Sequence, residues 1–236
     1  EFKDPGYRSK FNMKGKYRII PLNCGEYDND RIFDYEEVCV ATKDMTFQDY
    51  LEIRKFALIA EVIFNNQIFE VFFQYAIAEG MKKSDFILKA LKNIDKAPEK
   101  ITNIFNEFNR ETSEELWESE EEMVKFYKKS ENFKKLVSGE AGGNLMYKYK
   151  SLNIVKAMPE WMDYLTTLIT DLVVAENAQK NEFSTEESNI KKQEINMLAE
   201  YHKNKTWKFL ENTSEEELSM LSNYDFVSWL KNLENE

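Results

Sequence analysis

The chain has 236 residues, of which 42% are hydrophobic, 14% aromatic and 32% charged, and its formal net charge at pH 7 is −11. This composition is too apolar for a disordered chain, and the acidic balance disfavours nucleic acids and anionic membrane surfaces, which attract basic proteins. Seven glycines and four prolines are too few for the many turns of a β-sandwich, so we expect a mainly α fold, a multi-helix bundle with a small N-terminal antiparallel β arm.

The first 45 residues differ from the rest of the chain and contain the predicted strands. Asp4-Pro5-Gly6 is a turn signal, and residues 23–30 are typical of a loop. Runs rich in β-branched and aromatic residues predict two or three short strands, at 17–20, 31–33 and 37–42. Because two strands alone are only marginally stable in water, we expect residues 1–45 to form an arm and linker from a missing upstream domain, and either the following helices or that missing segment supplies the surface on which it packs.

Helix is predicted from Thr46 onward. The hydroxyl of Thr46 can cap the free backbone N–H groups, with Asp49 as its capping-box partner. Residues 47–64 and 67–79 then form two helices around an Asn-Asn break, and Gly80 ends the second one. The second helix is apolar on most sides, so we expect this hairpin to form the core of the domain.

Further helices complete a helical domain over residues 46–236. Caps and breakers predict their positions: 84–93 with Ser84 as cap, 98–109 from Pro98, an acidic helix capped by Thr112, 144–156, 159–176, 184–210 with a Ser184–Glu187 capping box, a short turn from Ser214, and 224–233. The glycine-rich segment 139–143 is the predicted hinge or sub-domain boundary.

Residue types that carry chemistry are scarce. The chain has one histidine, His202, and two cysteines, Cys24 and Cys39. An iron–sulfur cluster needs three or four neighbouring thiolates, and a Glu-x-x-His metal motif is absent because Ala199 lies three residues before His202. We therefore predict no catalytic, metal-binding or cofactor-binding residue here, and interpret the cysteines as structural. No apolar run approaches the roughly 20 residues of a membrane span, so cytoplasmic residence is expected.

One carboxylate stands out, since Glu61 interrupts the apolar run 56–64. A buried unpaired carboxylate costs several kcal/mol, so Glu61 is either a polar anchor facing a cavity or partner, or a helix-edge residue that meets Asn65 or a distant lysine. Arg54 lies seven positions earlier on a similar face. Arg54, Glu61 and Asn65 form the candidate polar patch for a substrate or an interface. Basic pairs such as the one containing Lys150 are interpreted as solvated helix faces.

The stretch from residue 17 to residue 80 resembles a known family. The residues that carry the resemblance are Tyr17-Arg18-Ile19-Ile20-Pro21, the run 36–46 (Glu-Glu-Val-Cys-Val-Ala-Thr-Lys-Asp-Met-Thr), Asp49-Tyr50, Arg54-Lys55-Phe56-Ala57-Leu58 and Phe64-Asn65-Asn66. They resemble the region after the catalytic barrel in cobalamin-binding radical S-adenosylmethionine (radical SAM) enzymes, where a short β segment leads into an aromatic-rich helix. The opening Asp4-Pro5-Gly6-Tyr7 is similar to the exit from such a barrel.

The chain departs from the family at its cofactor motifs, because neither the three-cysteine motif nor a cobalamin-binding histidine motif occurs in these residues. The resemblance therefore implies the C-terminal, cluster-free region of such an enzyme. The iron–sulfur cluster, S-adenosylmethionine and cobalamin would belong to the parent chain, and no catalytic residue is carried over. The chain opens with Glu1-Phe2, which a common cloning junction encodes, so we expect it to be a piece of a longer protein.

Two functions of different classes follow. The first is a non-catalytic helical region that contributes substrate enclosure or subunit contacts to a radical SAM enzyme, with the upstream domain of the same parent chain as its partner and with homo-oligomer contacts as a further role. The alternative is an autonomous helical module for protein–protein interaction, which would bind a partner through an exposed apolar groove. A stand-alone enzyme ranks third.

Overall fold

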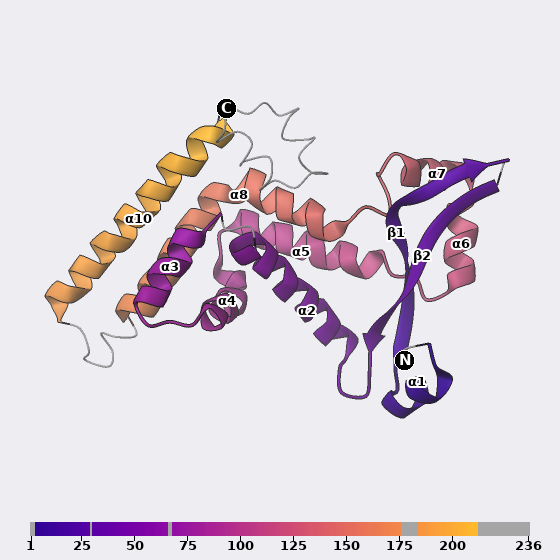
Figure 1. Cartoon of the computed structure of the whole chain (residues 1–236), viewed down its shortest axis with the longest axis horizontal. Coiled ribbons are helices and arrows are strands. Elements are labelled where there is room, and N and C mark those ends of the chain that lie inside the picture. Colours follow the sequence, from indigo (N-terminus) through magenta and orange to yellow (C-terminus); the bar gives the residue numbers. More distant parts are fainter. Residues whose placement is uncertain (1–2, 29, 66–67, 176–183, 212–236) are drawn as a thin grey trace. The chain divides into compact units, whose positions relative to one another are not determined.

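The computed structural model describes residues 3–28, 30–65, 68–175 and 184–211 (Figure 1). The fold is mainly α with a two-stranded antiparallel sheet near the N-terminus, which confirms the predicted class. The chain divides into two compact units: unit 1 comprises Glu1–Lys55 and Glu107–Met146, and unit 2 comprises Phe56–Asn106 and Tyr147–Glu236. The turn predicted from Ser214 and the helix predicted at 224–233 lie outside the described residues.

Unit 1 opens with the short helix α1 (Pro5–Phe11), where the sequence predicted only a turn. The Asp4 carboxylate accepts a hydrogen bond of 2.7 Å from the backbone N–H of Tyr7, and Pro5 occupies the first turn. Proline is tolerated there because its missing N–H would have no helical partner anyway. The same residues that signal a turn therefore also start a helix, and the left-handed Asn12 (φ 48°) ends it.

The sheet is a hairpin of β1 (Lys14–Tyr27) and β2 (Asp30–Ala41). It is longer than predicted, because the expected loop at 23–30 instead supplies the paired ends of both strands. Pairing shifts from Ile19 opposite Tyr35 to Cys24 opposite Phe33, so the intervening residues of β1 form a bulge. The bulge contains Pro21, which has no N–H to give to a sheet ladder. The loop-like composition of residues 23–30 led the sequence analysis to predict a loop where the two strands in fact continue.

One face of the hairpin builds the hydrophobic core of unit 1. The helices α6 (Glu120–Tyr127) and α7 (Ser130–Val137) cover this face. The buried members are Ile19, Phe33, Met123, Phe133 and Leu136. Gly142 follows α7 at φ 66°, and a Cβ there would lie 2.9 Å from the side chain of Ile19. Only glycine satisfies both the backbone conformation and the close approach, which explains one glycine of the predicted hinge.

Capping predictions for this unit had mixed outcomes. The Thr46–Asp49 capping box of α2 (Phe47–Ala60) is confirmed, because each residue's side chain accepts from the other's backbone N–H, at 3.1 and 2.8 Å. The predicted Thr112 cap is wrong, since Thr112 is buried inside α5 (Glu99–Glu114). Helix α6 is capped instead by Ser119, whose hydroxyl accepts from the N–H of Glu122 at 3.3 Å.

Unit 2 is built around α3 (Glu70–Ala78), which the sequence predicted to be buried on most sides. Its core also draws on α4 (Lys83–Lys92), the short η2 (Ile94–Lys96), α8 (Leu145–Thr170) and α10 (Thr185–Glu211). Its fully buried large side chains include Leu58, Ile63, Phe69, Phe72, Phe73, Phe86, Ile101 and Trp161. Helix α4 has Lys82 at its N-cap, so the Ser84 cap was wrong.

Helix α8 joins two segments that the sequence predicted as separate helices. Ala157 has non-helical angles (φ −125°, ψ 18°) two residues before Pro159, so the helix kinks where the proline interrupts its hydrogen bonds. A buried side-chain bond bridges the kink, from Trp161 Nε1 to Asn153 Oδ1 at 3.0 Å. The predicted break is therefore present, but packing keeps the two halves in one bent helix.

Helix α10 packs on α3 within unit 2 through polar and apolar contacts. The hydroxyl of Tyr75 donates to Glu194 at 2.9 Å, and Lys191 pairs with Glu79 at 2.8 Å. Ile195 is fully buried in the same helix. The capping box predicted for its start is confirmed, with bonds of 2.7 and 3.2 Å between Ser184 and Glu187. The middle of this polar helix is thus held against α3 by an ion pair, a hydrogen bond and a buried apolar side chain.

Candidate functional site

The structure brings together two of the three residues of the predicted polar patch. Glu61 and Asn65 begin and end η1 (Glu61–Asn65), a π-helical turn that continues α2. The amide of Asn65 donates to Glu61 Oε1 at 2.6 Å. Single π-turns occur frequently at functional sites. Arg54 belongs to unit 1, where it has a different set of neighbours.

Glu61 also forms an ion pair with Lys150 of α8, at 3.7 Å between Oε2 and Nζ. The lysine side chain is only 5% exposed and the glutamate 30%. The Lys150 ammonium lies 4.9 Å from the ring centre of Tyr147, which favours the cation further. The interpretation of Lys150 as part of a solvated face is therefore wrong. A buried lysine from a distant helix accounts for a carboxylate within an apolar run.

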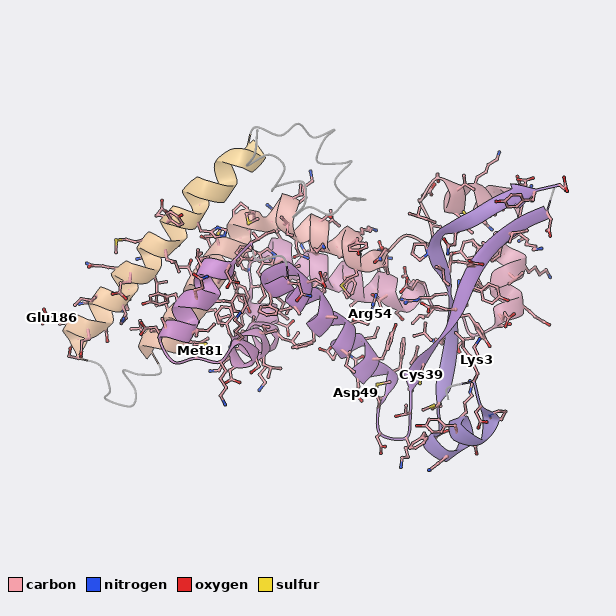
Figure 2. The ribbon with its side chains drawn as sticks, in the orientation of Figure 1. Lys3, Cys39, Asp49, Arg54, Met81 and Glu186 are labelled. Atoms are coloured by element: carbon pink, nitrogen blue, oxygen red, sulfur yellow. The ribbon has the colours of Figure 1, made fainter. Side chains whose placement is uncertain are left out.

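Arg54 lies in a cluster of two arginines and two glutamates within unit 1. Its guanidinium stacks over the ring of Phe108 at 5.7 Å, and Figure 2 labels it on α2. Arg18 of β1 bonds Glu36 at 2.7 Å and Glu115 at 3.3 Å. Glu115 also interacts electrostatically with Arg54. We call Arg18, Glu36, Arg54 and Glu115 the arginine–glutamate cluster.

Burial and charge oppose each other in the arginine–glutamate cluster. Burial raises the pKa of Glu115, although the charges of Arg18 and Arg54 act to lower it. Burial acts to lower the pKa of Arg18, but the hydrogen bond that Arg18 donates to Glu36 and the charge of Glu115 outweigh it and raise that pKa. The two positive and two negative groups balance in number, so each charge has an opposite charge near it, although burial still disfavours the charged form of Glu115.

Three buried polar atoms on α2 and α5 have no hydrogen-bond partner among the described residues: Arg54 Nε, Asn109 Oδ1 and Thr112 Oγ1. Asn109 and Thr112 lie three positions apart in α5, which places them one turn from each other. Arg54 Nε can donate, Asn109 Oδ1 can accept, and the Thr112 hydroxyl can do both. The chemistry available is therefore hydrogen bonding to a polar group, since no described base activates the Thr112 hydroxyl as a nucleophile.

The cysteines and the histidine occupy structural positions. Cys24 packs against the core of unit 1, and Cys39, labelled on β2 in Figure 2, lies 3.5 Å from the carbonyl oxygen of Ala41. His202 is buried, with its ring stacked on Phe69 and a ring nitrogen hydrogen-bonded to the carbonyl of Ile68. Among the residues that the structure describes, no three His, Cys, Asp or Glu side chains could together hold a metal ion.

A cavity of about 520 Å³ with a mixed polar and apolar lining lies within unit 2, between α4–η2 and the C-terminal half of α8 with η3 (Asp171–Ala175), a second π-turn. Its lining residues are Lys89, Asn93, Lys96, Pro98, Asp163, Tyr164, Thr167, Leu168, Asp171 and Leu172. The Tyr164 hydroxyl donates to the Ala90 carbonyl at 2.6 Å and joins the two walls. Burial, with a smaller contribution from Asp95, raises the pKa of Tyr164.

Sequence reasoning anticipated that Glu61 meets Asn65 or a distant lysine but did not identify Lys150, and it missed this cavity and the neighbours of Arg54. Lys89, Asn93 and Lys96 recur at helical spacing, which indicates that they share a face. That spacing does not indicate that Asp163 and Asp171 of another helix stand opposite. The signal available in the sequence was that two separate segments each carry charged residues on one helix face, basic in one segment and acidic in the other.

No protein-family model, no curated protein and no solved structure matches this chain. No single helix in the described part of the chain is long and apolar enough to cross a membrane. The segments Phe47–Asn65 and Glu70–Ala78 reach that length and composition only together, across a bend of 88°. Inferences about function therefore rest on the residues of this chain and their contacts.

Proposed function

We propose that this chain is the C-terminal, cluster-free region of a cobalamin-binding-type radical SAM enzyme of the cytoplasm. In this proposal it is not catalytic alone, and it contributes substrate enclosure or subunit contacts to a parent chain that binds the iron–sulfur cluster, S-adenosylmethionine and cobalamin. The observation that carries the proposal is the family-like pattern from residue 17 to residue 80.

The local structure of that pattern supports the proposal. The run 36–46 covers the second half of β2 and the turn that follows it, and the Thr46–Asp49 capping box then starts α2. A strand that leads through a short turn into an aromatic-rich helix is the order expected from the resemblance. The pattern thus corresponds to one continuous structural passage rather than to scattered matches.

Exposed apolar side chains at the distal end of the hairpin support a role in contacts. Leu22, Tyr27 and Ile32 are 82%, 67% and 50% exposed. Gly25 pairs with Ile32, and the ring of Tyr27 lies so close to Gly25 that a Cβ there would be 2.8 Å from it. Tyr27 and Ile32 therefore lie near each other at the end of the hairpin, and Leu22 is exposed in the bulge before it. Exposed apolar side chains that gather on one surface mark interaction sites. The upstream domain of the parent chain is the occupant we propose.

The parent reading frame and its cofactor content test this proposal. Three closely spaced cysteines encoded upstream of Glu1 are expected. After anaerobic reconstitution with iron and sulfide, the full-length protein should show cluster absorbance and stoichiometric iron, whereas the 236-residue chain treated in parallel should show neither. A start codon directly before Glu1, or stoichiometric iron in the 236-residue chain, would refute the proposal and favour the autonomous interaction module.

A paired substitution tests the contact role. Ile32→Ser should lower the thermal midpoint of the full-length protein by at least about 2 °C more than that of the 236-residue chain, because only the full-length protein loses the apolar contact with the upstream domain. Leu88→Ser is the matched control, since Leu88 is similarly exposed but lies on α4. Equal effects of Ile32→Ser in the two proteins would contradict a contact with the upstream domain.

A further inference from the structure

We propose that the outward side of α10 is a docking surface for α10 of a second copy of this chain, with the two helices antiparallel. Two features of α10 carry the inference: a row of exposed apolar side chains, and charges of opposite sign at the two ends of the helix. The inference goes beyond the proposed function, because it concerns α10 of unit 2 rather than the hairpin of unit 1.

Helix α10 uses one face to pack within its own unit. Ser188, Ile195 and His202 recur every seven residues and are only 9%, 0% and 4% exposed. Two helical turns take about 7.2 residues, so this spacing keeps the three residues on one face. Figure 1 shows α10 beside α3, the helix on which it packs. The buried face therefore accounts for the attachment of α10 to unit 2.

A second apolar row lies on nearly the opposite side of α10. Ile190 and Met197 each follow a residue of the buried face by two positions, which is about 200° around the helix. Tyr201 follows Met197 by four positions and shares its side. The three side chains are 47%, 65% and 60% exposed, and we call them the outer row. Apolar residues spaced by seven and four are typical of helices that pair along a seam.

The outer row is complementary to itself in the antiparallel direction. If Ile190 of one copy lies opposite Tyr201 of the other, the twofold axis passes between positions 195 and 196. The second contact between Ile190 and Tyr201 then forms as well, by symmetry. The two Met197 side chains flank the axis and are about 4.5 Å apart along the helices. A surface that meets itself in this way closes at two copies, so the occupant is a second copy of the chain.

The charges at the ends of α10 favour the same direction. Glu186 and Glu187 are exposed in the first turn. Lys205 and Lys208 stand four and seven positions after Tyr201, so their positions continue the side of the outer row toward the C-terminal end. Pairing about the same axis sets Glu186 opposite position 205 of the other copy. A parallel pair would instead set like charges together, so the order of the charges selects the antiparallel dimer.

Sedimentation equilibrium of the 236-residue chain measures the dimer. We expect a Kd of about 10–100 µM, because the outer row is a small surface. Met197→Glu places two like charges beside the axis and should raise that Kd about tenfold or more. Asn196→Glu is the matched control, since it adds the same charge at an exposed position about 100° away on the same helix. It should change the Kd less than about twofold, and circular dichroism checks that both variants are folded.

Disulfide trapping tests the register. In a Cys24→Ala/Cys39→Ala background, Ile190→Cys/Tyr201→Cys should give a covalent dimer on mild oxidation, because the two positions face each other across the axis. Either cysteine alone should give little covalent dimer, since identical positions of the two copies lie about 16.5 Å apart along the helices.

The outcomes separate as follows. A dimer that Met197→Glu weakens, that Asn196→Glu leaves unchanged and that only the double cysteine variant traps supports the docking surface. A monomer at about 200 µM, equal effects of the two glutamate variants, or equal trapping by single and double cysteine variants would overturn it. A monomer whose thermal midpoint falls with Met197→Glu would also overturn it, because the outer row would then be covered within one chain. These measurements use only this chain, so their failure is distinct from failure of the radical SAM proposal, which depends on the parent reading frame.

Discussion

The ion pair between Glu61 and Lys150 predicts that substituting Glu61 destabilises the protein more than substituting Lys150 does. Lys150 is 5% exposed and Glu61 is 30% exposed, at a separation of 3.7 Å. Breaking a buried pair costs about 3–5 kcal/mol when the remaining charge is left buried and uncompensated. The two single substitutions should therefore differ, because they leave different charges behind.

Glu61→Gln leaves the buried ammonium without its carboxylate and should lower the free energy of unfolding by about 3 kcal/mol. Lys150→Met keeps most of the side-chain volume and leaves a partly exposed carboxylate that Asn65 still hydrogen-bonds. We expect it to cost only about 1.5 kcal/mol. The double variant should also cost about 1.5 kcal/mol, which corresponds to a coupling energy of about 3 kcal/mol.

Urea unfolding followed by circular dichroism measures these differences. With a slope of about 2 kcal/mol per molar urea, Glu61→Gln should move the midpoint down by about 1.5 M. Lys156→Met is the control, because Lys156 is an exposed lysine of the same helix. If Lys150→Met were as costly as Glu61→Gln, or the coupling energy fell below about 0.5 kcal/mol, the pair would not be the reason for Glu61.

Three other predictions concern single residues. Thr112→Val should leave the urea midpoint unchanged or raise it, because the buried hydroxyl has no hydrogen-bond partner among the described residues; a loss above about 1 kcal/mol would contradict this. Ser119→Ala should cost about 1 kcal/mol through loss of the cap on Glu122, and Ser119→Asp should restore it; a loss that Asp does not restore would point to another role. Hydrogen bonds from Ser184 lower the pKa of Glu187 below its ordinary value of 4.5. The contribution of this carboxylate to stability is therefore present above pH 4.5 and is lost as the pH falls through the lowered pKa. Glu187→Gln should reduce the acid sensitivity of the thermal midpoint, and an unchanged pH profile would count against the cap.

Most of the helices and strands were predictable from the sequence, because their formation depends on nearby residues. The Thr46–Asp49 and Ser184–Glu187 boxes act over three positions, and Pro159 disrupts only its own helix. Where local signals failed, packing prevailed. Thr112 could cap a helix, but burial of its face extends α5 past it. Residues 23–30 have a loop composition, but the hairpin continues through them because Phe33 and its neighbours pack on α6 and α7.

The candidate site was predictable only in part. Glu61 and Asn65 lie within one helical turn, so their contact was among the interpretations that the sequence allowed. Arg54 was grouped with them from spacing alone, whereas its described contacts are with Phe108 and with the charge of Glu115. Spacing indicates which residues share a face, but it does not indicate what that face meets.

By itself, the amino-acid order determined the helical class, the N-terminal β arm, several helix starts and the scarcity of residues for redox or metal chemistry. Only the tertiary structure decided which charges are buried together and where a cavity forms. Arg18 meets Glu115 from 97 positions away, and Tyr164 meets Ala90 from 74. Local propensity acts over a few residues, whereas such pairs arise when apolar faces are removed from water and bring distant segments together.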